Sequence, residues 1–284
     1  MERYLVVGLA KTGTTVISKT IQNTLGLNNY FIEPTKVSFF ESFGAQPDTD
    51  GVVKILFDQW FRRPRLLNAI VFDELRCGFK AQIFITRDPR AEFISRLHYL
   101  AYPYFSEMQR RPEDREDWID LFRAKQSDPE IPLSVMLETL RERFGCRVQP
   151  GNVMVERYAE LIARLPSHRC TPLRYEDFVA GTLSDHPLAH LFSGSRDVGP
   201  DLSRTRRSAG NEDWMSFVTD ADIGWMDQAF APLCTALGYS PGIPEQAVRD
   251  RLASPVSAAT SSDYVARLID EATDLAVIRN APAA

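Results

Sequence analysis

Residues 4–15 read Tyr-Leu-Val-Val-Gly-Leu-Ala-Lys-Thr-Gly-Thr-Thr, and this stretch decides the fold. The apolar run at its start predicts a buried strand, and Gly8 and Gly13 bound a tight loop that leads into a helix beginning near Thr14. Glycines let the backbone approach an anion closely, and the free N–H groups at a helix start point at negative charge. The stretch predicts a phosphate-binding loop; a strand, turn and helix without a ligand is the simpler alternative.

The position of the lysine separates this loop from that of ATP- and GTP-binding proteins. Gly8 and Gly13 keep the spacing of G-x-x-x-x-G-K-[ST], but Thr14 stands where the lysine should follow. The pattern therefore disfavours an ordinary nucleoside triphosphate and favours a different phosphate-like group. The residues expected to contact that group are Lys11, Thr12, Gly13, Thr14 and Thr15.

The composition is that of a globular protein. The chain has 284 residues, of which 44% are hydrophobic and 25% are charged. We expect no membrane span, because no apolar run approaches the roughly 18 residues that a spanning helix needs. The first strand begins so close to Met1 that we also expect no signal peptide and a cytoplasmic location. A net charge of -5 argues against a general nucleic-acid binder.

The cysteines give no sign of a metal site. They are widely separated, without a C-x-x-C pair, and no histidine stands at metal-ligand spacing. We expect all four to behave as small buried hydrophobes, and we expect no metal. They are Cys77, Cys146, Cys170 and Cys234.

The length allows one large α/β domain, with two small domains as the alternative. Strand and helix patterns alternate along residues 1–240 and favour one α/β domain of three layers, α/β/α, with a central parallel sheet. Further strands are expected at 30–32, 52–55, 69–72, 82–86 and 171–175. Helices are expected at 14–25, 89–100, 153–165, 183–192 and 220–237. A helical insertion is expected at about 104–145. We expect residues 241–284 to be an extension with one amphipathic helix, about 263–278, which packs on the domain or on a second subunit of a homodimer.

Candidate catalytic and binding residues follow two of the predicted strands. Glu33 precedes Pro34 at a strand end, where α/β proteins place ligands, and is a candidate base; an exposed loop glutamate is the alternative. Arg87 ends another strand, and Ser95 stands eight residues later on the helix, so both could bind one phosphate. A surface ion pair is the alternative for Arg87. His98 is a second candidate base, although a histidine in a Leu-His-Tyr run is more often packed in a core.

Four segments, in order, resemble the sulfotransferases that use 3′-phosphoadenosine 5′-phosphosulfate (PAPS). Residues 8–15 resemble the loop that binds the 5′-phosphosulfate, and residues 85–95 are similar to the 3′-phosphate motif, with its arginine-to-serine spacing of eight. Residues 173–177, Leu-Arg-Tyr-Glu-Asp, resemble a further recurrent segment of the family. Residues 207–214 resemble a weakened form of its C-terminal Arg-Lys-Gly-x-x-Gly-Asp-Trp segment, with Ser208, Ala209 and Glu212 as departures.

The resemblance implies a P-loop NTPase-like sulfotransferase fold and a reaction. PAPS would be the cosubstrate and adenosine 3′,5′-bisphosphate (PAP) the product, with in-line transfer of a sulfuryl group to a hydroxyl, less often an amine, of a small-molecule or carbohydrate acceptor. Lys11 would stabilise the leaving phosphate, and Arg206 or Arg207 would contact the 3′-phosphate. No clear counterpart exists of the catalytic histidine of the phenol and steroid members, whereas Glu33-Pro34 is similar to a feature of carbohydrate-directed members.

Two other functions stay open at this point. One is a P-loop kinase-like phosphotransferase that uses ATP and magnesium, which the absence of a lysine after Gly13 disfavours. The other is a non-catalytic nucleotide-binding protein, in which Lys11 and Glu33 would be dispensable. No motif in the chain identifies the acceptor.

Overall fold

The computed structural model describes residues 2–46, 48–106, 113–148, 153–165, 171–200, 202, 211–243 and 261–280. The chain divides into two compact units. The first comprises Met1–Asp88 and Asn152–Thr205, and the second comprises Pro89–Gly151 and Arg206–Ala284. These bounds differ from the expected division at residue 240, and the predicted C-terminal helix belongs to the second unit.

The first unit is built on a parallel sheet, which confirms the expected α/β class. In the described part of the chain the sheet has five strands in the order β2-β3-β1-β4-β5, and every neighbouring pair is parallel. The strands are β1 (Arg3–Gly8), β2 (Tyr30–Ile32), β3 (Gly51–Leu56), β4 (Ala81–Thr86) and β5 (Thr171–Arg174). Because all strands run the same way, the segments that follow β1, β2, β3 and β4 start from one edge of the sheet.

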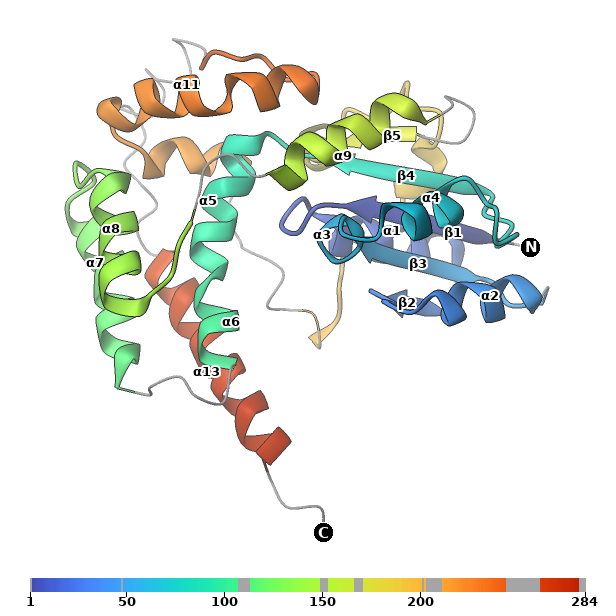
Figure 1. The fold of residues 1–284 in the computed structure, drawn as a ribbon, viewed down its shortest axis with the longest axis horizontal. Helices are drawn as coiled ribbons and strands as arrows, with labels where there is room; N and C mark the ends of the chain where they lie inside the picture. The colour runs from blue at the N-terminus through green and yellow to red at the C-terminus, as the bar shows by residue number, and fades with distance from the viewer. Residues whose placement is uncertain are drawn as a thin grey trace. The chain divides into compact units, whose positions relative to one another are not determined.

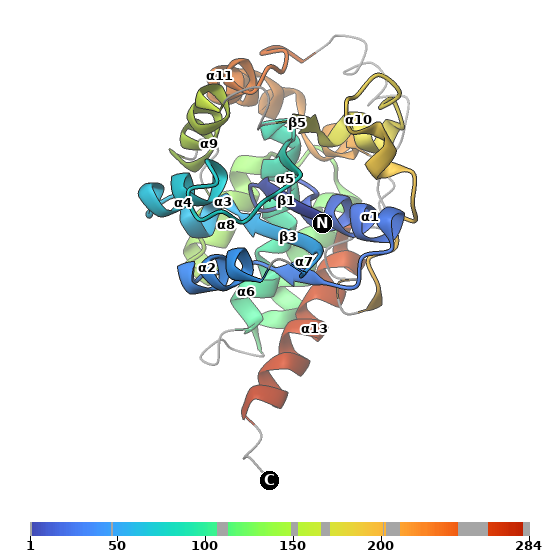
Figure 2. The ribbon, with the colours of Figure 1, turned by 90° about the vertical axis from the view of Figure 1, so that its right-hand side faces the viewer.

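Helices cover both faces of this sheet. Among the described residues, the first unit contains the helices α1 (Thr14–Leu25), α2 (Val37–Ala45), α3 (Phe57–Trp60), α4 (Pro64–Val71), α9 (Val153–Arg164), α10 (Tyr175–Ala180) and the 3-10 helix η1 (Ala189–Phe192). Figures 1 and 2 show α1 on one face and α3, α4 and α9 on the opposite face. Helix α1 ends as expected, at Gly26 with a φ of 62°.

Two expected elements are wrong. Residues 69–72 form no strand, because Ala69, Ile70 and Val71 belong to α4. Pro64 fits the first position of that helix, and the buried Leu67, Ile70 and Val71 recur at helical spacing. The helix expected over 183–192 shrinks to the 3-10 turn η1, after a loop that contains Pro187.

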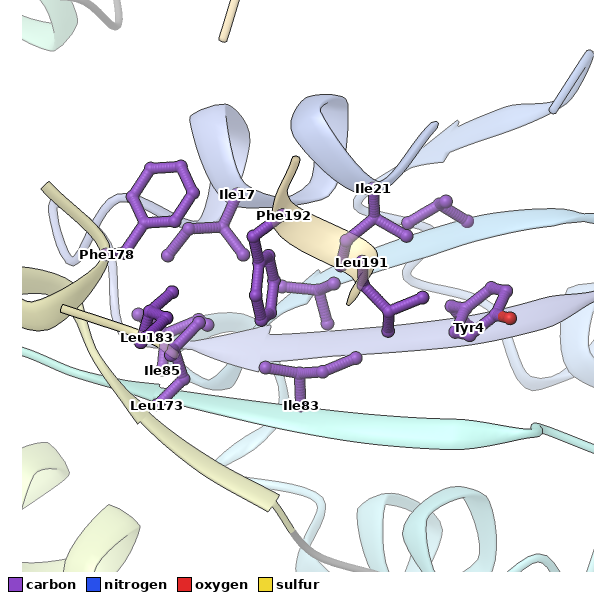
Figure 3. Close-up of a cluster of buried hydrophobic side chains, with 12 residues drawn as sticks. Tyr4, Ile17, Ile21, Ile83, Ile85, Leu173, Phe178, Leu183, Leu191 and Phe192 are labelled. Carbon is purple, nitrogen blue, oxygen red and sulfur yellow. The ribbon is translucent and has the colours of Figure 1, made fainter. Parts of the chain in front are cut away.

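The core of the first unit fills the space between α1 and the sheet. Figure 3 shows Ile17 and Ile21 of α1 packed above Tyr4, Ile83 and Ile85 of the central strands. Phe178, Leu191 and Phe192 close the cluster from the segment that follows β5. Alternate residues of β1 and of β4 contribute, as the two-residue period of a strand requires. This packing holds the N-terminal turn of α1 in place at the edge of the sheet where the parallel strands end.

The second unit is helical, as expected for the insertion and for the C-terminal segment. It contains α5 (Pro89–Tyr99), α6 (Ala101–Ser106), α7 (Asp114–Ser127), α8 (Leu133–Phe144), the 3-10 helix η3 (Asn211–Phe217), α11 (Asp220–Ala236) and α13 (Ser261–Asn280). Helix α13 packs on α6 and α7. Trp118, Phe122 and Phe144 are buried in this unit. No helix in the described ranges has the length and apolar character to cross a bilayer.

The cysteine prediction holds for Cys77 and Cys234, which are buried. Burial raises the pKa of the Cys77 thiol to about 11. Cys146 is only half-buried, so for this residue the expectation was too strong. Cys170 lies outside the described residues.

Candidate functional site

Two glycines shape the loop between β1 and α1. A Cβ atom on Gly8 would lie 2.5 Å from Cγ2 of Thr14 and 2.7 Å from Oγ1 of Thr12, so a side chain does not fit there. Gly13 has a φ of 84°, and a Cβ on it would lie 2.2 Å from the ring of Tyr175. Gly13 is also the N-cap of α1 and supplies no side-chain hydrogen bond to the helix start. An uncapped helix start behind a glycine loop suits an anionic ligand.

Side chains from three strand ends hold this loop. Asp58, two residues after β3, accepts the backbone N–H of Ala10 at an N–Oδ2 distance of 2.7 Å. Arg87, just after β4, donates from Nη1 to the carbonyl oxygen of Lys11 at 2.8 Å. The guanidinium of Arg87 also lies 4.8 Å from the centre of the Tyr175 ring, which follows β5. The loop therefore has a fixed shape, in which Lys11 takes the left-handed φ of 65° that few non-glycine residues adopt.

A buried lysine connects the start of α1, beside the glycine loop, to Glu33. The Lys54 side chain is only 5% exposed, and its Nζ lies 2.6 Å from Oε1 of Glu33. The same Nζ donates to Oγ1 of Thr15, in the first turn of α1, at 2.9 Å. The other carboxylate oxygen of Glu33, Oε2, accepts from Nε2 of Gln59 at 2.8 Å. One hydrogen-bonded network thus joins the candidate base to the start of α1.

The sheet register explains why Lys54 can make both contacts. Lys54 of β3 stands between Val6 of β1 and Ile32 of β2 in the parallel register. Glu33 is therefore the first residue beyond the edge strand, and its own N–H donates to the carbonyl oxygen of Lys54 at 2.8 Å. Glu33 has a φ of 49°, an unfavourable value for glutamate that the surrounding contacts must hold in place. Its side chain remains 27% exposed, so a ligand can reach the carboxylate.

The structure brings together most of the predicted loop residues. Thr12, Thr14 and Thr15 are buried beside the loop, and Lys11 and Gly13 are half-buried. Arg87 contacts the loop itself, a contact that the sequence did not predict. Nε of Arg87 is buried with no hydrogen-bond partner in the described part of the chain.

The other predicted site residues lie in the second unit or outside the described residues. Ser95 is half-buried on α5, in the second unit, so its shared phosphate contact with Arg87 stays a prediction. His98 is also in the second unit and is fully buried. Its Nδ1 lies 2.7 Å from the carbonyl oxygen of Ile94, and its ring packs on Phe122 and Phe217, an environment typical of a core histidine. Arg206 and Arg207 lie outside the described residues.

Three residues of the site escaped the sequence analysis. Lys54 carried a signal, because a lysine within the apolar run Val-Val-Lys-Ile needs a partner if the run is a buried strand. Asp58 and Gln59 carried none, since their roles depend on the turn by which α3 follows β3. Only the fold shows that this turn lies beside the phosphate loop.

Comparisons with protein-family models, curated proteins and solved structures find no match. The geometry of the site therefore carries the functional argument. Among the described residues, no group of three or more His, Cys, Asp or Glu side chains is placed to hold a metal ion.

The arrangement combines three chemical capacities. The loop and the uncapped start of α1 can bind an anionic oxygen. The ammonium of Lys54 puts a buried positive charge between that position and Glu33. Glu33 retains acceptor capacity, because each carboxylate oxygen can accept two hydrogen bonds and Lys54 and Gln59 use one on each. The loop could therefore bind an anion while Glu33 accepts a hydrogen bond from a hydroxyl, both at the same edge of the sheet.

Proposed function

We propose that this protein is a PAPS-dependent sulfotransferase of the P-loop-like fold, which transfers a sulfuryl group to a hydroxyl of a small-molecule or carbohydrate acceptor. One observation carries the proposal: Lys54 bridges Glu33 to Thr15 of the phosphate loop, with distances of 2.6 and 2.9 Å. Group transfer from a phosphate needs a base and an anion-binding loop side by side, and this network supplies both.

The residues present fit the donor's anionic end. The close contacts around Gly8 and Gly13 hold the loop in a shape that side chains there would prevent, and the start of α1 behind the loop has no side-chain cap. When bound, PAPS supplies the sulfuryl group and a good leaving phosphate. Lys11, Thr14 and Thr15, with the first N–H groups of α1, would hold the oxygen on which negative charge develops. In this scheme Lys11, which precedes Gly13, would supply the positive charge at the leaving phosphate oxygen, so no lysine after Gly13 is required.

Glu33 would accept the acceptor's proton. The acceptor oxygen forms the new bond to sulfur as the bond between sulfur and the bridging phosphate oxygen breaks, and the hydroxyl proton passes to Glu33. Lys54 and Gln59 would orient the carboxylate, because each fixes one of its oxygens. The products are a sulfate ester and PAP, so atoms and charge balance without a further reactant.

A second anion contact is proposed at Arg87. Its Nη1 is used by the loop, but the guanidinium has other donors, and its buried Nε has no acceptor in the described residues. Ser95, and Arg206 or Arg207, are proposed to complete the contact with the 3′-phosphate, as the family resemblance implies.

A transfer assay tests this function. Wild-type protein is incubated with PAPS labelled on sulfur and a panel of hydroxylated acceptors, and labelled ester is separated from free sulfate. Glu33→Gln should lower the rate by about a hundredfold or more, because the amide cannot accept the proton. Glu41→Gln, an exposed glutamate on α2, is the matched control and should retain activity.

Two results would argue for the alternatives. Transfer of phosphate from ATP in the presence of magnesium would indicate a kinase-like enzyme. Tight binding of PAP without transfer to any acceptor, and without an effect of Glu33→Gln, would indicate a non-catalytic nucleotide-binding protein.

A further inference from the structure

Four exposed cations lie along the segments that follow Glu33 and Gln59. We call Lys36, Arg62, Arg63 and Arg65 the basic cluster. Within the described ranges none of the four pairs with a carboxylate: Arg63 bonds a backbone carbonyl, and Arg62 lies over the ring of Phe61.

This lack of ion pairs contrasts with the exposed arginines of α7 and α8. Arg115 and Arg123 of α7 each pair with a carboxylate, as do Arg141 and Arg143 of α8. The whole chain carries a net charge of -5, so carboxylates are not scarce. The carboxylates nearest the basic cluster in the chain are engaged elsewhere, Glu33 with Lys54 and Asp58 with the N–H of Ala10.

Contacts tie the basic cluster to the candidate base. Gln59, which bonds Glu33, stands three residues before Arg62 at the end of α3. Nη1 of Arg63 donates to the carbonyl oxygen of Thr35, two residues after Glu33, at 3.3 Å. Figure 2 shows α2, α3 and α4 together on the side of the sheet opposite α1. The segments that carry the cluster are therefore linked to Glu33, through the Gln59 hydrogen bond and the Arg63 contact with Thr35.

Two of these cations stand at helix N-termini, where acidic or small polar residues are preferred. Lys36 is the N-cap of α2 and Arg63 is the N-cap of α4, and neither helix has an acidic residue in its first turn. Positive side chains at helix starts repel the helix dipole, so the preferred residues there are acidic or small and polar. Such an exception is expected where function compensates for it.

We propose that the basic cluster binds an anionic acceptor, one that carries carboxylate or sulfate groups beside the hydroxyl to be modified. Arginine suits this task because its planar guanidinium pairs with both oxyanions through two parallel hydrogen bonds. An anion at the cluster would place the neighbouring hydroxyl near Glu33. The identification of this ligand as the acceptor rests on the proposed function. The anion site itself can be tested independently of that function.

The test measures binding by calorimetry with two matched probe pairs. Tetragalacturonate is compared with neutral maltotetraose, and sucrose octasulfate with sucrose, each in the absence and presence of saturating PAP. At least one anionic probe should bind, its neutral partner should not, and PAP should not displace it. Arg62→Gln combined with Arg65→Gln should weaken that binding by about tenfold or more, since charged hydrogen bonds are lost.

A double variant with the same charge change is the control. Arg123→Gln combined with Arg141→Gln removes two exposed, ion-paired arginines and should leave the affinity within about twofold. Equal weakening by both double variants would overturn the proposal, as would a failure of both anionic probes to bind. Displacement of the probe by PAP would also overturn the proposal, because it would show that the cluster binds the donor and not the acceptor. If PAP itself does not bind, the proposed donor fails, while cluster-dependent probe binding without PAP still supports the anion site.

Discussion

Lys54 is the residue on which the proposed chemistry depends most. A lysine in the middle of a parallel sheet loses its hydration, and its burial is tolerable only because Glu33 and Thr15 bond its ammonium. In return the lysine fixes the Glu33 carboxylate at a definite distance from the phosphate loop. The same contacts thus serve the packing of the strand and the geometry of the site.

Replacing Lys54 by methionine should separate these two roles. Lys54→Met keeps the apolar stem but frees Oε1 of Glu33, so we expect turnover of an acceptor found in the transfer assay to fall about a hundredfold. The folded state should persist, as judged by circular dichroism. Lys80→Met is the matched control, because it removes a surface ion pair with Glu2 away from the site. Full turnover of Lys54→Met would refute the role given to the network.

Gly13 offers a second residue-scale prediction. Gly13→Ala would place a Cβ 2.2 Å from the Tyr175 ring, whereas Gly26→Ala shares the left-handed φ but meets nothing within 4 Å. Both variants should lose about 1 kcal/mol from backbone strain, and Gly13→Ala should lose clearly more stability and its PAP binding. Thermal unfolding measures both. Equal destabilisation would show that the Tyr175 contact does not shape the loop.

At the scale of elements, the sequence correctly predicted the strands and helices whose hydrophobic pattern fits only one type of secondary structure. The strand expected at 4–7 and the helix expected at 14–25 were confirmed as β1 and α1, because the apolar run and the glycine spacing are local signals. The strand expected at 69–72 failed because a short apolar run fits a strand or one face of a helix equally well. Pro64 was the local signal that could have decided in favour of α4.

Helix α11 provides an element-scale prediction. The Thr219 side chain accepts the N–H of Asp222, and the carboxylate of Asp222 accepts the N–H of Thr219, which forms a reciprocal cap. Thr219→Ala should destabilise the protein by about 1 kcal/mol. Thr235→Ala, near the other end of the helix, removes an exposed hydroxyl bonded to its own helix and should be nearly neutral. Denaturant unfolding of both variants checks the difference.

At the scale of the whole molecule, the sequence was informative about the first unit and less so about the site. The glycine loop between β1 and α1 and the strand-end position of Glu33 follow from local patterns. The contacts of Lys54, Asp58 and Arg87 do not, because they arise when three strand ends, distant in sequence, meet at one sheet edge. The division into two units also has no local signal, since each unit is assembled from two separate parts of the chain.

We propose that the loop binds the phosphosulfate end of PAPS and not a nucleoside triphosphate. Isothermal titration of the protein with PAP, and separately with ATP with and without magnesium, tests this most directly. We predict that PAP binds at least about tenfold more tightly than ATP under either condition, and that Lys11→Ala weakens PAP binding by about tenfold. Tighter binding of ATP with magnesium, or no measurable binding of PAP, would contradict the claim.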